Sequence, residues 1–391
     1  MKNMMTSLAL AATLAVVCGC ATAPAPDVSA GDVAAITSAT KCPPLKVGVY
    51  ADHGASGIGA IEWFRLVNES PEMEIRLLDG RAVRAGGLNG LDMLVMPGGS
   101  SKAEFESLGT NGVNKLKSFI RNGGGYIGTC AGCCLLMDET GGSRKRANVM
   151  PWNTTGSESA TMFPTFNLNA AGAAVLGLKE GPHVMRYHGG PFMWPTTNHI
   201  EGAKFELWGT YDAEATMKGR VDPKKRMYGA AAIIGGTYGK GRVFAISAHP
   251  EYFNSTLYVV KAAFKYVTGR DVTFPERRRS PRALSVGFLA KGVGGIDSAE
   301  TALALAAEKD FDLVLIGTDG AAQRHLDHVD VLVLSNASPL KNKVLADAID
   351  AFVARGGKIV AFGTGVKAMP KGGVKCGPRG DTVKAIRSLF D

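Results

Sequence analysis

The segment 123–136, GGGYIGTCAGCCLL, places three of the chain's seven cysteines within five positions, at Cys130, Cys133 and Cys134. Three interpretations fit this spacing: a nucleophile with two buried neighbours, a redox pair formed by Cys130 and Cys133, or an apolar core segment without chemistry. A redox pair of the C-x-x-C type belongs to a thioredoxin-like fold, which the flanking glycines do not fit. The surrounding residues therefore favour a nucleophile.

Cys130 stands in the pattern G-x-C-x-G of residues 128–132, where an expected strand turns into an expected helix. Small residues on both sides allow a strained turn that lifts the nucleophile clear of a sheet. At the start of a helix, the dipole and the free N–H groups favour the thiolate, which is the reactive form of cysteine. We predict Cys130 as the nucleophile, and Cys133 and Cys134 as small buried residues of the helix.

A cysteine nucleophile needs a base, a group that orients the base, and donors for the oxyanion. The segment SAHPE ends an expected strand with His249 and Glu251, whose side chains share one side because strands repeat every two residues. We predict His249 as the base and Glu251 as its orienting group. The N–H of Ala131 and the turn formed by Gly98 and Gly99 are the predicted oxyanion hole.

The other histidines do not form a metal pattern. His183, His188 and His199 are spaced by five and eleven residues, which matches no zinc signature, so we predict neither a metal nor another cofactor. His188 and Trp194 belong to the segment YHGGPFMW, and we predict that they line the substrate cleft.

The elements that would position these residues alternate between strand and helix. Apolar runs predict strands at 45–50, 73–80 and 91–101, and one apolar face predicts a helix at 111–125. This alternation predicts a flavodoxin-like, doubly wound parallel sheet with helices on both sides. Residues 150–240 are less regular and rich in Gly, Pro, Trp and Thr, which predicts a β-rich insertion with long loops near the site.

Residues 283–391 repeat the opening of the chain. LKVGVY corresponds to LSVGFL, and FIRNGGGYIGTCAG at 119–132 aligns without gaps with FVARGGKIVAFGTG at 352–365, which places Gly363 opposite Cys130. A duplicated flavodoxin-like unit explains these matches, and chance similarity among glycine-rich strands is the alternative. The second copy lacks the cysteine and the Pro-Gly-Gly turn, so we predict that it cannot perform the first copy's chemistry.

Residues 1–20, MKNMMTSLALAATLAVVCGC, are typical of an export signal with a positive end and a short apolar stretch. The ending VCGC resembles a bacterial lipobox, which implies cleavage before Cys20 and lipidation of its thiol. Ordinary secretion with cleavage after residues 21–23 is the alternative. Residues 21–44 are rich in Ala, Pro, Ser and Thr, which predicts a flexible tether. We therefore predict a lipid-anchored protein of the cell envelope that faces the periplasm or the cell exterior.

Length and composition predict two domains. The chain has 391 residues, of which 46% are apolar and 20% charged, which favours globular α/β structure over disorder. We place the domains at 45–274 and 283–391, with a basic linker at 275–282. The net charge of +9 lies in short runs without interleaved aromatic residues, so no nucleic-acid partner is predicted. Once the signal is removed and Cys20 acylated, an odd number of irregularly spaced cysteines remains, which makes a disulfide framework a poor explanation.

The motifs PGG, GGGYIGTCAG and GKGRVFAISAHPE occur in an order that resembles the class I glutamine amidotransferase-like superfamily. Within it, the chain is most similar to the family named for the N-terminal domain of biotin–protein ligases, with which YHGGPFMW also agrees. This resemblance covers residues 45 to about 270. It implies a flavodoxin-like domain in which Cys130, His249 and Glu251 occupy the catalytic triad positions, with Gly98 and Gly99 at the oxyanion turn.

The sequence shows no synthetase, ammonia-accepting or biotin-transferring domain, so we predict neither amidation of a partner substrate nor biotin ligase activity. The chief hypothesis is a thiol hydrolase or amidase of the glutamine amidotransferase-like type that acts on a small amide or a peptide. The alternative is a binding or scaffold lipoprotein that keeps the fold and the site without turnover.

Overall fold

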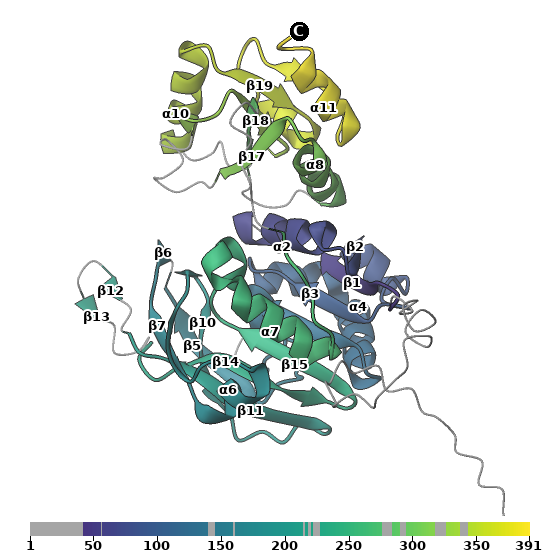
Figure 1. Cartoon of the computed structure of the whole chain (residues 1–391), viewed down its shortest axis with the longest axis vertical. Coiled ribbons are helices and arrows are strands. Elements are labelled where there is room, and N and C mark those ends of the chain that lie inside the picture. Colours follow the sequence, from purple (N-terminus) through teal and green to yellow (C-terminus); the bar gives the residue numbers. More distant parts are fainter. Residues whose placement is uncertain are drawn as a thin grey trace, which may run out of the picture. The chain divides into compact units, whose positions relative to one another are not determined.

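The computed structural model describes residues 42–55, 57–139, 145–158, 161–213, 216–217, 220–221, 227–275, 284–289, 295–316, 326–336 and 343–391 (Figure 1). The predicted signal peptide, Cys20, and nearly all of the tether and of the basic linker lie outside the described residues. Within the described part of the chain, every helix is too short or too polar to cross a membrane.

The larger sheet contains five parallel strands in the order β2-β1-β3-β4-β15. This order corresponds to 2-1-3-4-5 along the chain, which is the flavodoxin-like arrangement and confirms the predicted fold class. The strands are β1 (Leu45–Tyr50), β2 (Met73–Leu78), β3 (Met93–Met96), β4 (Gly125–Thr129) and β15 (Gly241–Ile246). β3 and β4 are buried along their whole length, as expected for a parallel sheet covered on both faces.

Helices connect these strands and cover the sheet, with α7 in front of it and α4 behind it in Figure 1. They are α2 (Gly57–Glu69), α3 (Gly80–Arg84), α4 (Ser101–Arg121), α5 (Ala131–Leu135) and α7 (Leu257–Thr268). α4 begins earlier than the helix predicted at 111–125, because Ser100 caps an additional segment by accepting a hydrogen bond from the N–H of Ala103. Gly109, with φ 60° and ψ 173°, separates this segment from the predicted one.

The insertion predicted at 150–240 is β-rich and extends the same sheet. Antiparallel strands follow β15 in the order β14-β11-β7-β8, and β10 pairs with both β14 and β5. These strands are β5 (Trp152–Ser157), β7 (Thr165–Leu168), β8 (Gly181–Val184), β10 (Pro191–Pro195), β11 (Ala203–Tyr211) and β14 (Ala231–Tyr238). The remaining elements are the pair β6 (Thr161–Met162) and β9 (Tyr187–His188), the pair β12 (Thr216–Met217) and β13 (Arg220–Val221), and helix α6 (Ala170–Leu176). In the sheet, the strands of the insertion therefore lie next to β15, the strand that leads to the predicted base His249.

The smaller sheet has five parallel strands in the order β17-β16-β18-β19-β20. They are β16 (Leu284–Leu289), β17 (Phe311–Ile316), β18 (Val331–Leu334), β19 (Lys358–Ala361) and β20 (Val374–Lys375). The helices of this part are α8 (Ile296–Ala307), α10 (Lys343–Ala354) and α11 (Gly380–Arg387), with a 3-10 helix η4 (Gly363–Ala368). The strand order is again 2-1-3-4-5, so the second flavodoxin-like unit is present.

Equivalent backbone details in the two sheets support the duplication. The N–H of Lys46 donates to the carboxylate of Asp92 at 2.7 Å, and the N–H of Ser285 donates to Asp330 at 2.8 Å. The position aligned with the cysteine elbow has a positive φ in both copies, 49° at Cys130 and 57° at Gly363, which glycine adopts readily. The shared strand order and register favour duplication over chance similarity of glycine-rich strands.

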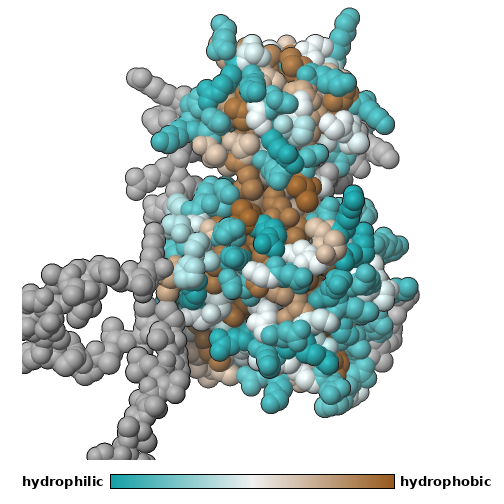
Figure 2. Space-filling view, turned by 90° about the vertical axis from the view of Figure 1, so that its right-hand side faces the viewer, coloured by the Kyte–Doolittle hydropathy of each residue, from teal (hydrophilic) through white to brown (hydrophobic). Residues whose placement is uncertain are grey.

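Apolar side chains fill the cores of both sheets, whereas hydrophilic residues cover most of the face drawn in Figure 2. Burial of this kind is the main favourable contribution to folding. Most of the predicted site residues follow the ends of the parallel strands β3, β4 and β15, whereas His188 and Trp194 lie in β9 and β10.

Candidate active site

Cys130 lies at the elbow between β4 and α5. Its backbone has φ 49° and ψ −104°, and it is one of three non-glycine residues with positive φ in the described ranges. This conformation is unfavourable for a residue with a side chain, and such strain is concentrated at functional sites. Only 5% of the residue is exposed. The strained turn predicted for the nucleophile is therefore present.

Close backbone packing explains the glycines on both sides of the elbow. A methyl group on Gly132 would lie 2.1 Å from the carbonyl oxygen of Met96, and one on Gly128 would lie 2.8 Å from that of Gly132. The N–H of Cys130 donates to the carbonyl of Ile246 at 2.9 Å. The G-x-C-x-G pattern thus lets α5 start against the end of β3 while β15 holds the elbow from the other side.

The strand predicted to carry His249 and Glu251 ends before them, because β15 stops at Ile246. Glu251 belongs to the 3-10 helix η1 (Pro250–Tyr252), so the turn after the strand, and not the strand period, sets the two side chains together. The Nδ1 of His249 lies 2.8 Å from the Oε1 of Glu251, and 6% and 0% of these side chains are exposed. A methyl group on Gly59, in the first turn of α2, would lie 2.6 Å from the same Oε1. The structure therefore brings the predicted base and its orienting group together and closes α2 over them.

The hydrogen-bonding partners of the His249 ring indicate its charge. Its Nδ1 faces the carboxylate of Glu251, and its Nε2 lies 3.3 Å from the carbonyl oxygen of His188. Both partners only accept hydrogen bonds, so an imidazolium that donates from each nitrogen satisfies them. Burial lowers the pKa of His249, but the charge of Glu251 and the hydrogen bond with Cys130 outweigh burial and raise the pKa to about 10.

His188 contacts the site through its backbone rather than its side chain. Its carbonyl oxygen lies 3.7 Å from the Sγ of Cys130, whereas its ring is exposed and 2.9 Å from the hydroxyl of Thr161. A methyl group on Gly190 would lie 2.0 Å from the carbonyl oxygen of Ser247. Close packing of the YHGGPF segment against the SAHPE segment thus holds this carbonyl between the nucleophile and the base. Side-chain types alone do not predict a role for a carbonyl group.

A cavity of about 450 Å³ opens beside the thiol. Its lining consists of Gly99, Ser100, Ser101, Lys102, Cys130, Ala131, Cys134, Thr154, Gly156, Ser157, Gly189 and Pro191. The predicted oxyanion residues Gly99 and Ala131 are both in this lining, and Gly98 is buried next to it. Trp194 does not line this cavity, and its Nε1–H donates to the hydroxyl of Thr155 at 3.2 Å. The roles of these residues in substrate binding stay predictions.

Gly98 lies between the nucleophile and the base. A methyl group on Gly98 would lie 2.7 Å from the Cε1 of His249 and 3.1 Å from the Cβ of Cys130. We expect Gly98→Ala to push the two side chains apart and to lower the rate of Cys130 alkylation by iodoacetamide at pH 7 by about tenfold. The matched control is Gly380→Ala, where an added methyl group meets nothing within 4 Å. Equal alkylation rates in the two variants would show that the turn at Gly98 does not hold Cys130 and His249 in place.

The other two cysteines of the segment are buried in α5, with 0% of Cys133 and 6% of Cys134 exposed. The Sγ of Cys133 lies 3.1 Å from the Sδ of Met193 on β10. Burial raises the pKa of both thiols, so they stay protonated and behave as small apolar residues. All five cysteines in the described ranges are free, and no group of three or more His, Cys, Asp or Glu in those ranges could hold a metal ion.

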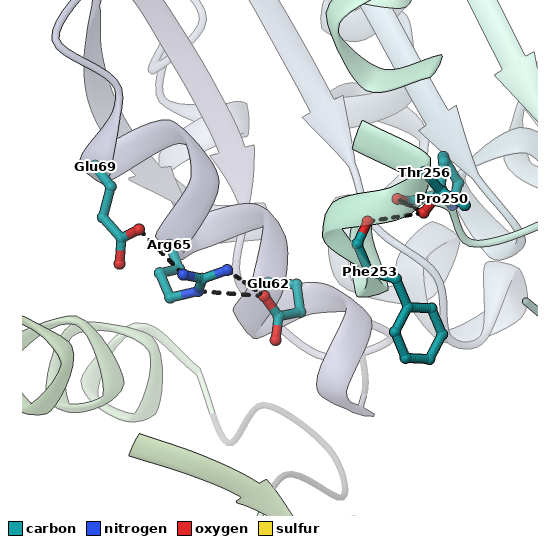
Figure 3. Close-up of polar contacts among 6 residues, drawn as sticks. All are labelled: Glu62, Arg65, Glu69, Pro250, Phe253 and Thr256. Carbon is teal, nitrogen blue, oxygen red and sulfur yellow. Dashed lines mark hydrogen bonds and ion pairs between the residues drawn. The ribbon is translucent and has the colours of Figure 1, made fainter. Parts of the chain in front are cut away.

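The loop that carries the His249–Glu251 pair is held in place by its own hydrogen bonds. The hydroxyl of Thr256 donates to the carbonyl of Pro250 at 2.7 Å and to that of Phe253 at 3.0 Å (Figure 3). On the neighbouring helix α2, the guanidinium of Arg65 forms ion pairs with Glu62 and with Glu69, one turn before and one turn after it (Figure 3). A fixed loop and a fixed helix limit the movement of the base and its orienting group.

A known protein family matches the part of the chain that contains the Cys130 elbow. Residues 86–136 match the family described as "Biotin-protein ligase, N terminal". The matched segment includes the turn with Gly98 and Gly99, helix α4, strand β4 and the Cys130 elbow. It confirms the predicted resemblance to that family over this segment. Among curated proteins, none matches the chain.

Several solved structures are similar to the chain in part. A putative ThuA-like protein from Bacteroides uniformis is 10% identical, with 59% of this chain and 94% of that chain covered and a TM-score of 0.44. A second putative ThuA-like protein, from Parabacteroides merdae, is 11% identical over 61% of this chain and 94% of that chain, with a TM-score of 0.39. PurLQS from Thermotoga maritima is 12% identical over 57% of this chain and 99% of that chain, with a TM-score of 0.36.

Proposed function

We propose that this chain is a thiol hydrolase or amidase of the glutamine amidotransferase-like type, with Cys130 as nucleophile, His249 as base and Glu251 as orienting group. One observation carries the proposal. A strained cysteine, a buried His–Glu pair 2.8 Å apart and a cavity of about 450 Å³ meet at one point at the ends of the parallel strands. This is the set of groups that acyl transfer through a covalent intermediate requires.

In the proposed reaction, the Cys130 thiolate attacks the carbonyl carbon of an amide, and N–H groups of the Gly99 turn and Ala131 stabilise the oxyanion. The C–N bond then breaks while the His249 imidazolium gives its proton to the leaving amine. Neutral His249 next takes a proton from water, which attacks the thioester. Cleavage of the C–S bond releases the acid and restores the thiolate.

We propose a small amide or a peptide of the cell envelope as the substrate. The residues that line the cavity include Ser100, Ser101, Thr154, Ser157 and Lys102, and a lining with these polar residues suits a small polar molecule. The export signal and the lipobox-like ending at Cys20 support a lipid-anchored protein that faces the periplasm or the cell exterior. Amidation of a partner substrate and biotin ligation are not part of this proposal.

The test is turnover of a panel of small amides and short peptides, followed as release of ammonia or amine. We expect Cys130→Ser to lower the rate at least about a thousandfold, because the serine hydroxyl is not ionised by the imidazolium beside it. The matched control is Cys42→Ser, an exposed cysteine, which is expected to keep the wild-type rate. No turnover of any panel member by the wild-type protein, or equal turnover by both variants, would favour the binding or scaffold alternative.

A further inference from the structure

Tyr252 is an aromatic residue beside the predicted base that the proposed mechanism does not use. It is the last residue of η1, directly after Glu251. Its ring centroid lies 5.4 Å from that of His249, with an angle of 74° between the two ring planes. Aromatic rings favour this edge-to-face arrangement. The imidazole therefore has a flat neighbour that limits its rotation about the Cβ–Cγ bond.

The first turn of α2 holds the tyrosine in this place. The hydroxyl of Tyr252 accepts a hydrogen bond from the N–H of Gly59 at 2.9 Å. A methyl group on Gly59 would lie 3.1 Å from the Cε2 of Tyr252 and 3.4 Å from the Nδ1 of His249. The same methyl group would lie 2.6 Å from the Oε1 of Glu251. The phenol, the imidazole and the carboxylate therefore pack against one short piece of backbone.

Arg186 contacts both the tyrosine and the base. Its guanidinium carbon lies 4.0 Å from the centroid of the Tyr252 ring, and its carbonyl accepts a hydrogen bond from the N–H of His249 at 2.8 Å. A guanidinium over the face of an aromatic ring is a favourable contact. The Nη1 of Arg186 is buried and has no hydrogen-bond partner in the described part of the chain. The ring of Tyr252 is therefore the contact that holds this guanidinium.

The backbone around Tyr252 is fixed as well, and its hydroxyl stays protonated. The hydroxyl of Thr256 donates to the carbonyls of Pro250 and Phe253, which lie on either side of the pair Glu251 and Tyr252 (Figure 3). Burial raises the pKa of the Tyr252 hydroxyl well above its ordinary value. A phenol with a raised pKa does not compete with an imidazole as a base, which leaves a role in holding the base.

We propose that Tyr252 is a positioning residue for His249: its ring fixes the rotation of the imidazole, so that Nδ1 stays directed at Glu251. The other ring nitrogen then faces the carbonyl of His188, which also contacts the Cys130 thiol. This inference rests on the proposed function, in which His249 is the base for Cys130. A base that moves away from its working position loses rate although its own chemistry is unchanged.

The experiment is a double-mutant cycle that measures the rate at which iodoacetamide alkylates Cys130 at pH 7. We expect Tyr252→Leu to lower this rate about fivefold, because the imidazole gains room to rotate. Tyr252→Phe keeps the ring and should recover most of the lost rate. In a His249→Ala background, Tyr252→Leu should have no further effect, since no imidazole is left to position. The matched control is Tyr258→Leu, an exposed tyrosine of α7, which should keep the wild-type rate.

A substitution that only loosens the fold would act in both backgrounds. Equal effects of Tyr252→Leu with and without His249, or no effect while His249→Ala slows alkylation, overturn the proposal. No effect of His249→Ala itself would overturn the assignment of the base and this inference together. Because alkylation needs no amide substrate, a lack of turnover in the amide panel leaves this result separately readable.

A second variant covers the case in which Tyr252→Leu fails to fold. Arg186→Met keeps an apolar stem and removes the guanidinium from the tyrosine ring. We expect it to lower the alkylation rate about twofold, and only where His249 is present. An equal loss of rate in the His249→Ala background would overturn the proposal in the same way.

Discussion

Replacing His249 with alanine is expected to lower the rate at which iodoacetamide alkylates Cys130 at pH 7 by about thirtyfold. A cysteine without an activating partner is only a few per cent thiolate at that pH, whereas an adjacent imidazolium keeps the reactive form populated. In the wild-type protein, Cys130 should react well before Cys133 and Cys134, because burial raises the pKa of those two thiols. Mass spectrometry of the labelled peptides measures all three rates.

Two further variants test whether the slower alkylation of Cys130 in His249→Ala is due to the loss of an activating imidazolium. Glu251→Gln should slow alkylation in the same direction but less, because the imidazolium loses a charged partner at 2.8 Å and keeps its ring. His199→Ala is the matched control, since His199 is exposed in a loop away from the pair. Superimposable pH profiles of alkylation in wild type and His249→Ala would show that His249 is structural and that the triad assignment is wrong.

The second large effect is a loss of stability at alkaline pH. The pKa of His249 is raised from 6.5 to about 10 in the folded protein, because the Glu251 charge and Cys130 outweigh the opposing effect of burial. A raised histidine pKa contributes stability that is complete below pH 6.5 and is lost as pH rises through about 10. We expect the wild-type free energy of unfolding to fall by a few kcal/mol across this window, on the order of 1.4 kcal/mol for each unit of pKa shift.

His249→Gln isolates this contribution, because glutamine is neutral at every pH and its amide can still donate to Glu251. The difference in free energy of unfolding between wild type and variant should shrink steadily from pH 6.5 to pH 10. Ionisable groups far from His249 and Cys130 titrate alike in both proteins and cancel in the difference. A difference that stays constant with pH would mean that His249 has no raised pKa in the folded state.

Local sequence predicted most of the strands and helices of the first sheet and the candidate site residues. Apolar runs, glycine turns and the G-x-C-x-G and SAHPE motifs depend on near neighbours in the chain, and physical rules for strands, elbows and nucleophiles apply to them directly. The duplication was visible for the same reason, since aligned strands such as 45–50 and 284–289 keep the same pattern of apolar residues. A parallel sheet then follows, because alternating strands and helices pack in few ways.

Tertiary structure alone decided which groups from distant segments meet at Cys130. The His188 carbonyl reaches the thiol because Gly190 packs on Ser247, and the backbone group involved is the same in every residue type. Glu104 resembles any first-turn glutamate in the sequence, and only the loop at Gly54 makes it a buried acid whose carboxyl oxygens have no hydrogen-bond partner among the described residues. Trp194, predicted to line the cleft, is absent from the lining of the cavity beside Cys130, and its Nε1–H donates to the hydroxyl of Thr155. Burial and charge balance depend on contacts between residues far apart in the chain, so neither could be read from local sequence.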